Sequence, residues 1–159
     1  MSAAITIDAP SEKRNCADGR QYVLIVEDNK ADLLLIRESL KHMHVDAELI
    51  VAGDGAKAIT VLEEADRNPK APCPDVVLLD INLPKRSGRE VLYVLRRSER
   101  CAGARVIVVT SSGLQRDRDD MAGLGANEYF CKPCDYAEFM SLGEAVKRLL
   151  SKSPDTRPL

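Results

Sequence analysis

The sequence lacks the features that mark membrane, nucleic-acid-binding and secreted proteins. No apolar run approaches the roughly 20 residues that a membrane-spanning helix needs. The 23 Lys and Arg residues are balanced by 25 Asp and Glu residues, so no positive excess indicates binding to nucleic acid or to an anionic membrane surface. The start of the chain also lacks the apolar core of a signal peptide. We therefore expect a cytoplasmic protein that binds neither nucleic acid nor a membrane.

A disulfide framework is not expected either. The five cysteines are odd in number and accompany no export signal, which predicts reduced thiols. Cys131 and Cys134 form a C-x-x-C between a predicted strand and a predicted helix, as redox-active cysteines do. Thiol–disulfide chemistry at these two residues is therefore an alternative function. The other cysteines are Cys16, Cys73 and Cys101.

The composition is that of one soluble globular domain. A chain of 159 residues can bury one core and is too short for two ordinary domains. Hydrophobic residues make up 45% of the chain and charged residues 30%, far from the composition of disordered proteins. Residues 1–20 and 153–159 show no periodicity, so we expect flexible tails around a folded domain at 21–152.

Short apolar runs alternate with longer amphipathic segments throughout this domain, a pattern typical of a parallel sheet covered on both faces. Two mixed segments, Glu48–Ala52 and Asn127–Cys131, have the character of outer strands. Three continuous apolar runs are expected to form inner strands: Tyr22–Val26, Val76–Leu79 and Val106–Thr110.

Helices are expected between the strands. Apolar residues recur at steps of three and four from Leu33 to Met43 and from Phe139 to Leu149, which predicts two amphipathic helices. Weaker patterns predict shorter helices at 55–66, 88–99 and about 114–123. The predicted fold is α/β, a flavodoxin-like (βα)5 domain with a doubly wound five-stranded parallel sheet and helices on both faces.

Acidic residues follow two of the inner strands, at the sheet edge where parallel α/β proteins bind ligands. Glu27 and Asp28 follow the first strand, and Asp80 follows the third. These strands are neighbours in a right-handed winding, so the three carboxyl groups should converge. Converging carboxylates repel one another unless a cation neutralises them, and their oxygens suit Mg²⁺. The sequence therefore predicts a Mg²⁺ site.

A threonine and a lysine complete the expected site. Thr110 ends the fourth strand and Lys132 follows the last. Asp80 can attack phosphorus, Lys132 can take up charge on the phosphoryl oxygens, and Thr110 can donate a hydrogen bond to one of them. Taken singly, Asp28 could be a helix cap and Lys132 a surface lysine. Together the residues indicate phosphoryl chemistry.

Four segments, VEDNKAD, LLDINLPKRSG, VVTSS and YFCKP, resemble in order and spacing the receiver domain of two-component response regulators. The resemblance covers essentially all of residues 22–152. It implies that Asp80 accepts a phosphoryl group from the phosphohistidine of a sensor histidine kinase or a phosphotransfer protein, with Mg²⁺ present. Glu27 and Asp28 match the acid pair of the family, and Asn82 matches the residue whose backbone carbonyl binds the metal.

The resemblance also implies a switch. Thr110 matches the switch hydroxyl, Ser111 the small residue after it, and Tyr129 the switch aromatic. Lys132 matches the lysine that the family normally joins to proline by a cis bond, whereas Cys134 departs from the usual aromatic residue. Phosphorylation is expected to change the surface of the fourth helix, last strand and last helix, through which receivers commonly dimerise or meet targets.

With no output domain after residue 152, the chain resembles a stand-alone receiver that accepts and slowly loses a phosphoryl group without being a turnover enzyme. The segments EDNKADLLLIRESL and INLPKRSGREVL are most similar to single-domain regulators that serve phytochrome-type and other sensor kinases. Two alternatives explain less. A flavodoxin-like cofactor protein would place phosphate against Glu27 and Asp28, and a redox protein would leave the three acids unexplained.

Overall fold

The computed structural model describes residues 19–151. Of the predicted tails, 1–20 and 153–159, only Gly19 and Arg20 fall among these residues. None of the helices found within this range has the length and apolarity of a membrane span. The strands are β1 (Tyr22–Val26), β2 (Glu48–Ala52), β3 (Val76–Leu79), β4 (Arg105–Thr110) and β5 (Glu128–Cys131). The helices are α1 (Lys30–His42), α2 (Gly55–Arg67), α3 (Gly88–Arg97), α4 (Gln115–Gly123), α5 (Tyr136–Phe139) and α6 (Ser141–Leu150).

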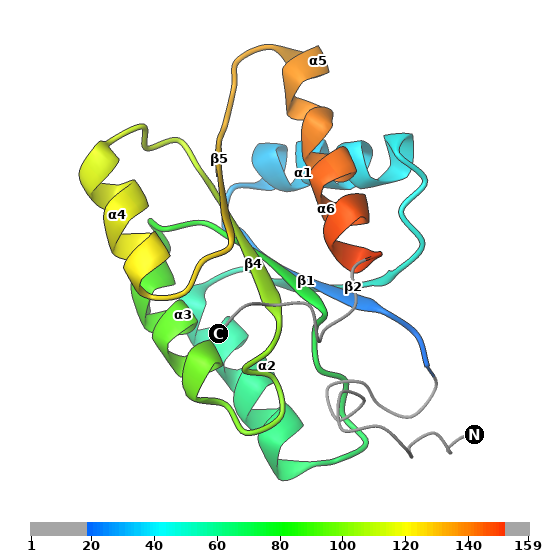
Figure 1. The fold of residues 1–159 in the computed structure, drawn as a ribbon, viewed down its shortest axis with the longest axis vertical. Helices are drawn as coiled ribbons and strands as arrows, with labels where there is room; N and C mark the ends of the chain where they lie inside the picture. The colour runs from blue at the N-terminus through cyan, green and yellow to red at the C-terminus, as the bar shows by residue number, and fades with distance from the viewer. Residues whose placement is uncertain (1–18, 152–159) are drawn as a thin grey trace.

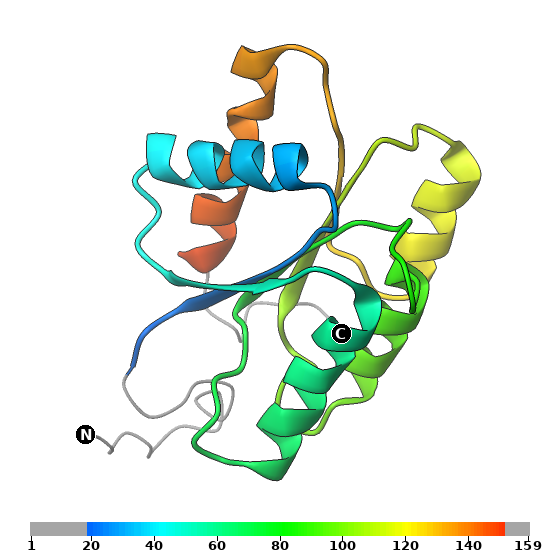
Figure 2. The same ribbon diagram turned by 180° about the vertical axis from the view of Figure 1, so that it is seen from behind.

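All five strands are parallel and form one sheet in the order β2-β1-β3-β4-β5. Helices α1, α5 and α6 cover one face, and α2, α3 and α4 cover the other (Figure 1). The reverse view in Figure 2 shows the same two layers. The predicted (βα)5 fold is confirmed, with β2 and β5 as the outer strands.

The inner strands are apolar along nearly all of their length because both faces of the sheet are covered; the polar exceptions are Arg105 and Thr110, at the two ends of β4. Val23 and Ile25 of β1 pack in the cluster beneath α1 and α6, whereas Leu24 and Val26 pack in the cluster beneath α2 and α3. Successive side chains of a strand point to opposite faces, so a strand buried on both sides shows no polar alternation. These strands form a rigid platform whose carboxyl ends carry the polar residues.

The last helical region differs from the single helix that the sequence predicts. It is divided at Met140 into α5 and α6. The backbone N–H of Gly143 donates to the Met140 carbonyl at 3.2 Å, a bond spanning three residues rather than four, so the chain tightens here into a 3₁₀-type turn. Met140 keeps dihedrals close to helical values (φ −64°, ψ −19°), and the two pieces continue the same stripe of buried side chains.

Cys73 and Cys101 form a disulfide, so the prediction of reduced thiols is wrong for this pair. Cys73 precedes β3 and Cys101 precedes β4. Since β3 and β4 are adjacent parallel strands, the loops that lead into them lie side by side and bring two cysteines that are 28 residues apart to a Cα–Cα distance of 5.5 Å. Both side chains are completely buried. An odd number of cysteines in the chain does not determine whether two particular cysteines lie close enough to form a disulfide.

Helices α1 and α6 approach so closely that only glycine fits between them. A Cβ atom on Gly143 would lie 2.1 Å from the carbonyl oxygen of Ser39 and 2.9 Å from Cγ of Met43. Ser39 is itself buried, with its hydroxyl donating to the Ile36 carbonyl at 2.7 Å. Backbone of α1 thus forms part of the surface on which α6 packs.

We predict that Gly143→Ala lowers the free energy of unfolding by about 2 kcal/mol, because the added methyl group forces the two helices apart. The matched control is Gly123→Ala at the end of α4, where nothing lies within 4 Å of the added atom. That variant should keep or raise stability by up to about 1 kcal/mol, as alanine favours helix more than glycine does. Urea unfolding measures both; equal stability of the two variants would contradict this account of the packing.

Candidate functional site

Three carboxylates meet at the carboxyl edge of the sheet. Oxygens of Glu27, Asp28 and Asp80 all lie within 4.8 Å of one another. Glu27 and Asp80 are buried, whereas Asp28 is exposed. β1 and β3 are paired in the sheet, and the residues that follow them emerge at the same edge. The structure therefore brings together the three acids that the sequence singles out.

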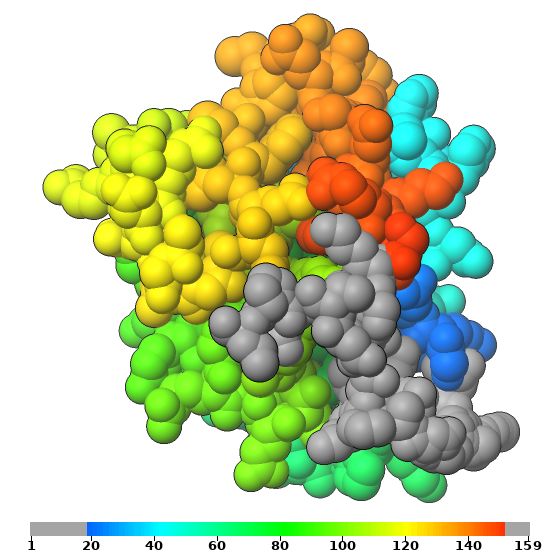
Figure 3. All heavy atoms as spheres, viewed as in Figure 1, coloured from blue at the N-terminus to red at the C-terminus, as the bar shows by residue number. Residues whose placement is uncertain are grey.

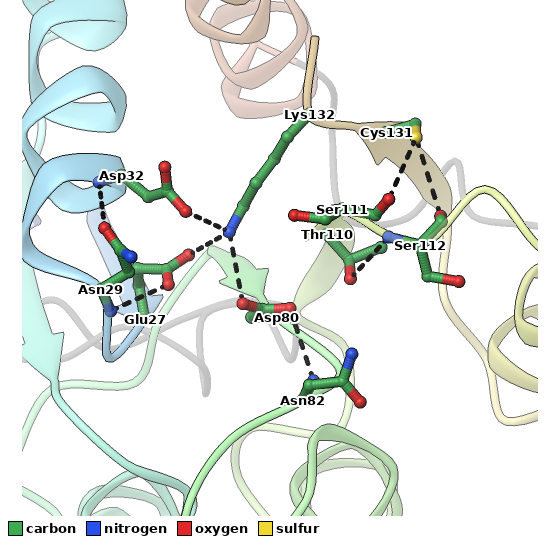
Figure 4. A network of polar contacts seen from close by, with 10 residues as sticks. All are labelled: Glu27, Asn29, Asp32, Asp80, Asn82, Thr110, Ser111, Ser112, Cys131 and Lys132. Atoms are coloured by element: carbon green, nitrogen blue, oxygen red, sulfur yellow. Dashed lines mark hydrogen bonds and ion pairs between the residues drawn. The ribbon is translucent and has the colours of Figure 1, made fainter. Parts of the chain in front are cut away.

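The ammonium group of Lys132 lies among carboxylates from three elements (Figure 4). Its Nζ atom is 2.9 Å from Oε1 of Glu27, 2.8 Å from Oδ2 of Asp32 and 3.3 Å from Oδ2 of Asp80. The side chain is only 8% exposed. Lys132 therefore bridges the two acidic strand ends to the start of α1.

Sequence reasoning missed Asp32. This residue lies in the first turn of α1, and its backbone N–H donates to the side chain of the N-cap residue Asn29 at 2.9 Å. The cap fixes the start of the helix, and the helix in turn aims the Asp32 carboxylate at Lys132. The one available signal was the position of Asp32 within the VEDNKAD segment.

Two residues of this cluster have shifted pKa values, through the combined effects of burial and neighbouring charges. Burial acts to lower the pKa of Lys132, but its hydrogen bonds with Asp32 and Glu27 and the charge of Asp80 outweigh burial and raise that pKa above its ordinary value. Burial raises the pKa of Glu27, and the hydrogen bond from Lys132 offsets this only in part. Lys132 thus stays charged, while ionised Glu27 is held at a cost.

The loop between β3 and α3 holds Asp80 from the other side. The backbone N–H of Asn82 donates to Oδ1 of Asp80 at 3.4 Å. Gly88 closes this loop: its N–H donates to the Ile81 carbonyl at 2.9 Å, and a Cβ atom there would lie 2.3 Å from the Asp80 carbonyl oxygen. Only glycine permits this approach, a requirement that the sequence alone did not reveal.

Thr110 is completely buried at the end of β4. Its hydroxyl accepts a hydrogen bond from the backbone N–H of Ser112 at 3.4 Å, so it faces the following loop. The hydroxyl of Tyr129, on β5, donates to the Ser112 carbonyl at 2.8 Å. Ser112, which the sequence analysis gave no role, thus joins the two expected switch residues.

The Lys132–Pro133 peptide bond is trans, not cis as the resemblance to receivers implies. The energy difference between the isomers of a bond to proline is small, so local packing decides between them. The backbone N–H of Lys132 donates to the Thr110 carbonyl at 2.8 Å, which continues the pairing of β4 and β5. From this anchored position the lysine side chain reaches the three carboxylates.

The two cysteines of the C-x-x-C motif do not pair. Both carry free thiols; Cys131 is half-buried and Cys134 is exposed. The Cys131 Sγ atom lies 3.7 Å from the Ser112 carbonyl oxygen, a weak contact with the loop after β4. The structure therefore does not support thiol–disulfide chemistry at these residues.

The donor set suits a hard divalent cation. Glu27, Asp28 and Asp80 offer carboxylate oxygens, which Mg²⁺ and Mn²⁺ prefer to sulfur or nitrogen. A single ammonium leaves their combined negative charge largely uncompensated. Bound metal would therefore relieve repulsion that the protein alone leaves in place.

We predict that Lys132→Met lowers the free energy of unfolding by about 2 kcal/mol at pH 8, because Glu27 loses its compensating cation. The pKa of Glu27 then rises further above its unfolded value. A raised carboxyl pKa costs stability above the unfolded pKa and ceases to do so as pH falls and the folded group is protonated, so the deficit should shrink at pH 5. Denaturant unfolding at both pH values, with Lys70→Met as an exposed-lysine control, measures this. An equal deficit at both pH values would rule out the explanation.

Comparison with known proteins places this geometry in a family. Residues 23–144 match the response regulator receiver domain. Response regulator Rcp1 of Synechocystis sp. (strain ATCC 27184 / PCC 6803 / Kazusa) is 34% identical over 127 residues, which cover 80% of this chain and 86% of Rcp1.

Two solved structures are similar throughout the fold. The phosphorylated cyanobacterial phytochrome response regulator RcpA has a TM-score of 0.74 at 31% identity, covering 84% of this chain and 96% of RcpA. The Mn²⁺-bound form of Rcp1 has a TM-score of 0.70 at 33% identity, covering 87% of this chain and 98% of that one. The chain described here belongs to the family of response regulator receiver domains of two-component systems.

Proposed function

We propose that this protein is a phosphoacceptor switch that takes a phosphoryl group onto Asp80 from the phosphohistidine of a sensor histidine kinase or phosphotransfer protein. One observation carries the proposal: Asp80 is the most loosely held carboxylate around Lys132. Its contacts with Lys132 and with the Asn82 N–H are 3.3 and 3.4 Å, whereas Lys132 binds Glu27 and Asp32 at 2.9 and 2.8 Å. A weakly bound carboxylate at the edge of the cluster is free to act as a nucleophile.

In the proposed transfer, a carboxylate oxygen of Asp80 bonds to phosphorus while the bond from phosphorus to the imidazole nitrogen breaks. The imidazole nitrogen keeps the electron pair of that bond. Lys132, which already contacts Asp80, compensates charge on the phosphoryl oxygens, and the Thr110 hydroxyl turns to donate to one of them. Later attack of water on the acyl phosphate returns free Asp80, so the protein acts as a timed switch and not as a turnover enzyme.

Mg²⁺ is the proposed cofactor. Glu27, Asp28 and Asp80 would hold it, together with the backbone carbonyl of Asn82. The ion would neutralise the acidic cluster and the incoming phosphoryl group. Support comes from the carboxylate geometry of this chain and from the Mn²⁺-bound form of its relative Rcp1.

The relatives also suggest a pathway. RcpA is a phytochrome response regulator, and we propose that this chain likewise serves a phytochrome-type sensor kinase in the cytoplasm. The proposed output surface consists of α4, β5, α5 and α6, parts of which share one face of the molecule in Figure 3. Leu114 and Tyr136 expose apolar area on these elements, 57% and 56% exposed respectively, and a homodimer or a target could bind there.

We predict that Asp80→Asn abolishes phosphoryl uptake. Incubation of the wild type with acetyl phosphate and Mg²⁺ should add the mass of one phosphoryl group through a bond that hydroxylamine cleaves. The amide is a poor nucleophile of nearly the same shape, so the variant should stay folded and unmodified. Intact-mass spectrometry compares them. Undiminished uptake by Asp80→Asn would refute the assignment.

We predict that Asp28→Ala weakens Mg²⁺ binding at least tenfold, since it removes a ligand, on the order of 1.4 kcal/mol or more. The same change relieves carboxylate repulsion and should raise the stability of the metal-free protein. Asp46→Ala is the matched control, an exposed acid that precedes β2 at the opposite end of the sheet. Calorimetric Mg²⁺ titration and thermal unfolding are the measurements. Unchanged affinity in Asp28→Ala would remove this residue from the site.

A further inference from the structure

The loop that joins β4 to α4, residues 111–114, is held in place through Ser112. The N–H of Ser112 donates to the Thr110 hydroxyl at 3.4 Å, and its carbonyl accepts the Tyr129 hydroxyl at 2.8 Å. The hydroxyl of Ser112 donates to Oδ2 of Asp117 in α4. One residue therefore connects the buried threonine, the aromatic ring on β5 and the first turn of α4.

Asp117 is anchored in turn to α3. Its second oxygen, Oδ1, accepts from Nη2 of Arg89 at 2.7 Å, and the same guanidinium nitrogen contacts Asp120 at 3.3 Å. The Asp117 side chain is only 15% exposed. The hydrogen bond from Ser112, together with Arg89, lowers the pKa of Asp117, so this carboxylate stays charged near neutral pH. A continuous chain of polar contacts thus runs from α3 through α4 to the loop.

Helix α4 also touches the aromatic ring directly. The guanidinium carbon of Arg118 lies 4.5 Å from the centre of the Tyr129 ring, within the range of a cation–π contact. Arg118 follows Asp117 in the chain, so adjacent residues of α4 hold Tyr129 and Ser112. Motion of the loop would therefore disturb its contacts with α4 and β5, and the α4 residue that it contacts is itself bound to α3.

These contacts oppose the movement that phosphorylation demands. If Thr110 turns its hydroxyl to a phosphoryl group on Asp80, the Ser112 N–H loses its acceptor and the loop is released on that side, while Asp117 still holds Ser112. A contact made in only one of two arrangements stabilises that arrangement by its own net free energy. We propose that Arg89, Asp117 and Ser112 form a latch that holds the loop in its unphosphorylated arrangement, an inference that rests on the proposed function.

The plain alternative is an ion pair that stabilises the fold alone. Arg89 is 37% exposed, and such pairs contribute little to folding. The two explanations predict different changes in affinity for a phosphoryl mimic when a contact is removed. Removing a merely structural contact leaves affinity for a phosphoryl mimic unchanged or lowers it, whereas removing a latch raises that affinity.

The test is a titration with beryllium fluoride in the presence of Mg²⁺, which mimics the acyl phosphate. The chain has four tyrosines and no tryptophan, so labelling with 3-fluorotyrosine gives few ¹⁹F signals, and Tyr129→Phe identifies the relevant one. In Asp117→Ala the half-saturating concentration should fall roughly three- to tenfold, the effect of one or two partly exposed polar contacts. Arg89→Gln should shift it in the same direction.

Asp119→Ala is the matched control, because Asp119 is exposed on the same helix and, within residues 19–151, accepts a hydrogen bond only from Gln115, at 2.9 Å. It should bind the mimic as the wild type does. Should Asp117→Ala fail to fold in urea-unfolding tests, Arg89→Gln, which leaves the loop intact, decides the matter. Half-saturation at an equal or higher concentration in the folded variants overturns the latch alone. A wild type that neither binds the mimic nor takes up phosphoryl from acetyl phosphate overturns the proposed function and the latch with it.

Discussion

The shortage of positive charge at the carboxyl edge of the sheet is the constraint on which the rest of the structure depends. Lys132 contacts the carboxylates of Glu27, Asp32 and Asp80, and a fourth carboxylate, that of Asp28, lies beside Glu27 and Asp80. Such a cluster disfavours folding, and the apolar platform beneath it must supply the free energy that holds it. In the proposed function, this same imbalance favours the binding of a divalent cation, and the bound cation then favours the approach of a phosphoryl group.

The strands of the sheet could be predicted because the hydrophobic pattern of each strand lies within a few consecutive residues. A strand buried on both faces is apolar throughout, which is why the bounds of β1 and β3 could be predicted correctly from the sequence. The bounds of β2, an outer strand that is largely exposed, followed from its mixed apolar and polar character. The meeting of Glu27, Asp28 and Asp80 followed from topology, since the sheet places the carboxyl ends of β1 and β3 together.

The features that the sequence did not predict all depend on which residues the fold brings close together. Asp32 belongs to the site because α1 directs its carboxylate toward Lys132. Glycine is required at position 88 because the loop there folds back onto the Asp80 carbonyl. The Cys73–Cys101 disulfide depends on two loops lying side by side. In the sequence Ser112 is one of several hydroxyl residues, and its role depends on its contacts with Thr110, Asp117 and Tyr129 in the fold. None of these leaves a periodic trace in the sequence.

Rigidity is distributed unevenly between the two ends of the sheet. At the amino end, the disulfide and Arg100, which donates to carbonyls of Asn68 and Ala71, fix the loops before β3 and β4. Arg96 donates to the Gly125 carbonyl at 2.6 Å and so fixes the carboxyl end of α4. These contacts leave the amino ends of the strands and the end of α4 little freedom to move.

The start of α4 is held differently. Its N-cap residue, Leu114, makes no side-chain hydrogen bond to the helix, and Met121 is the one fully buried residue of α4. With few buried side chains and no side-chain cap, the start of α4 depends on the contacts of Asp117 with Ser112 and Arg89 to stay in place. With the far end of α4 fixed by Arg96, release of Asp117 from Ser112 or Arg89 would free the near end first. In the proposed switch, a change at Thr110 would therefore displace the start of α4, beside the exposed Leu114, before it displaced the carboxyl end of the helix.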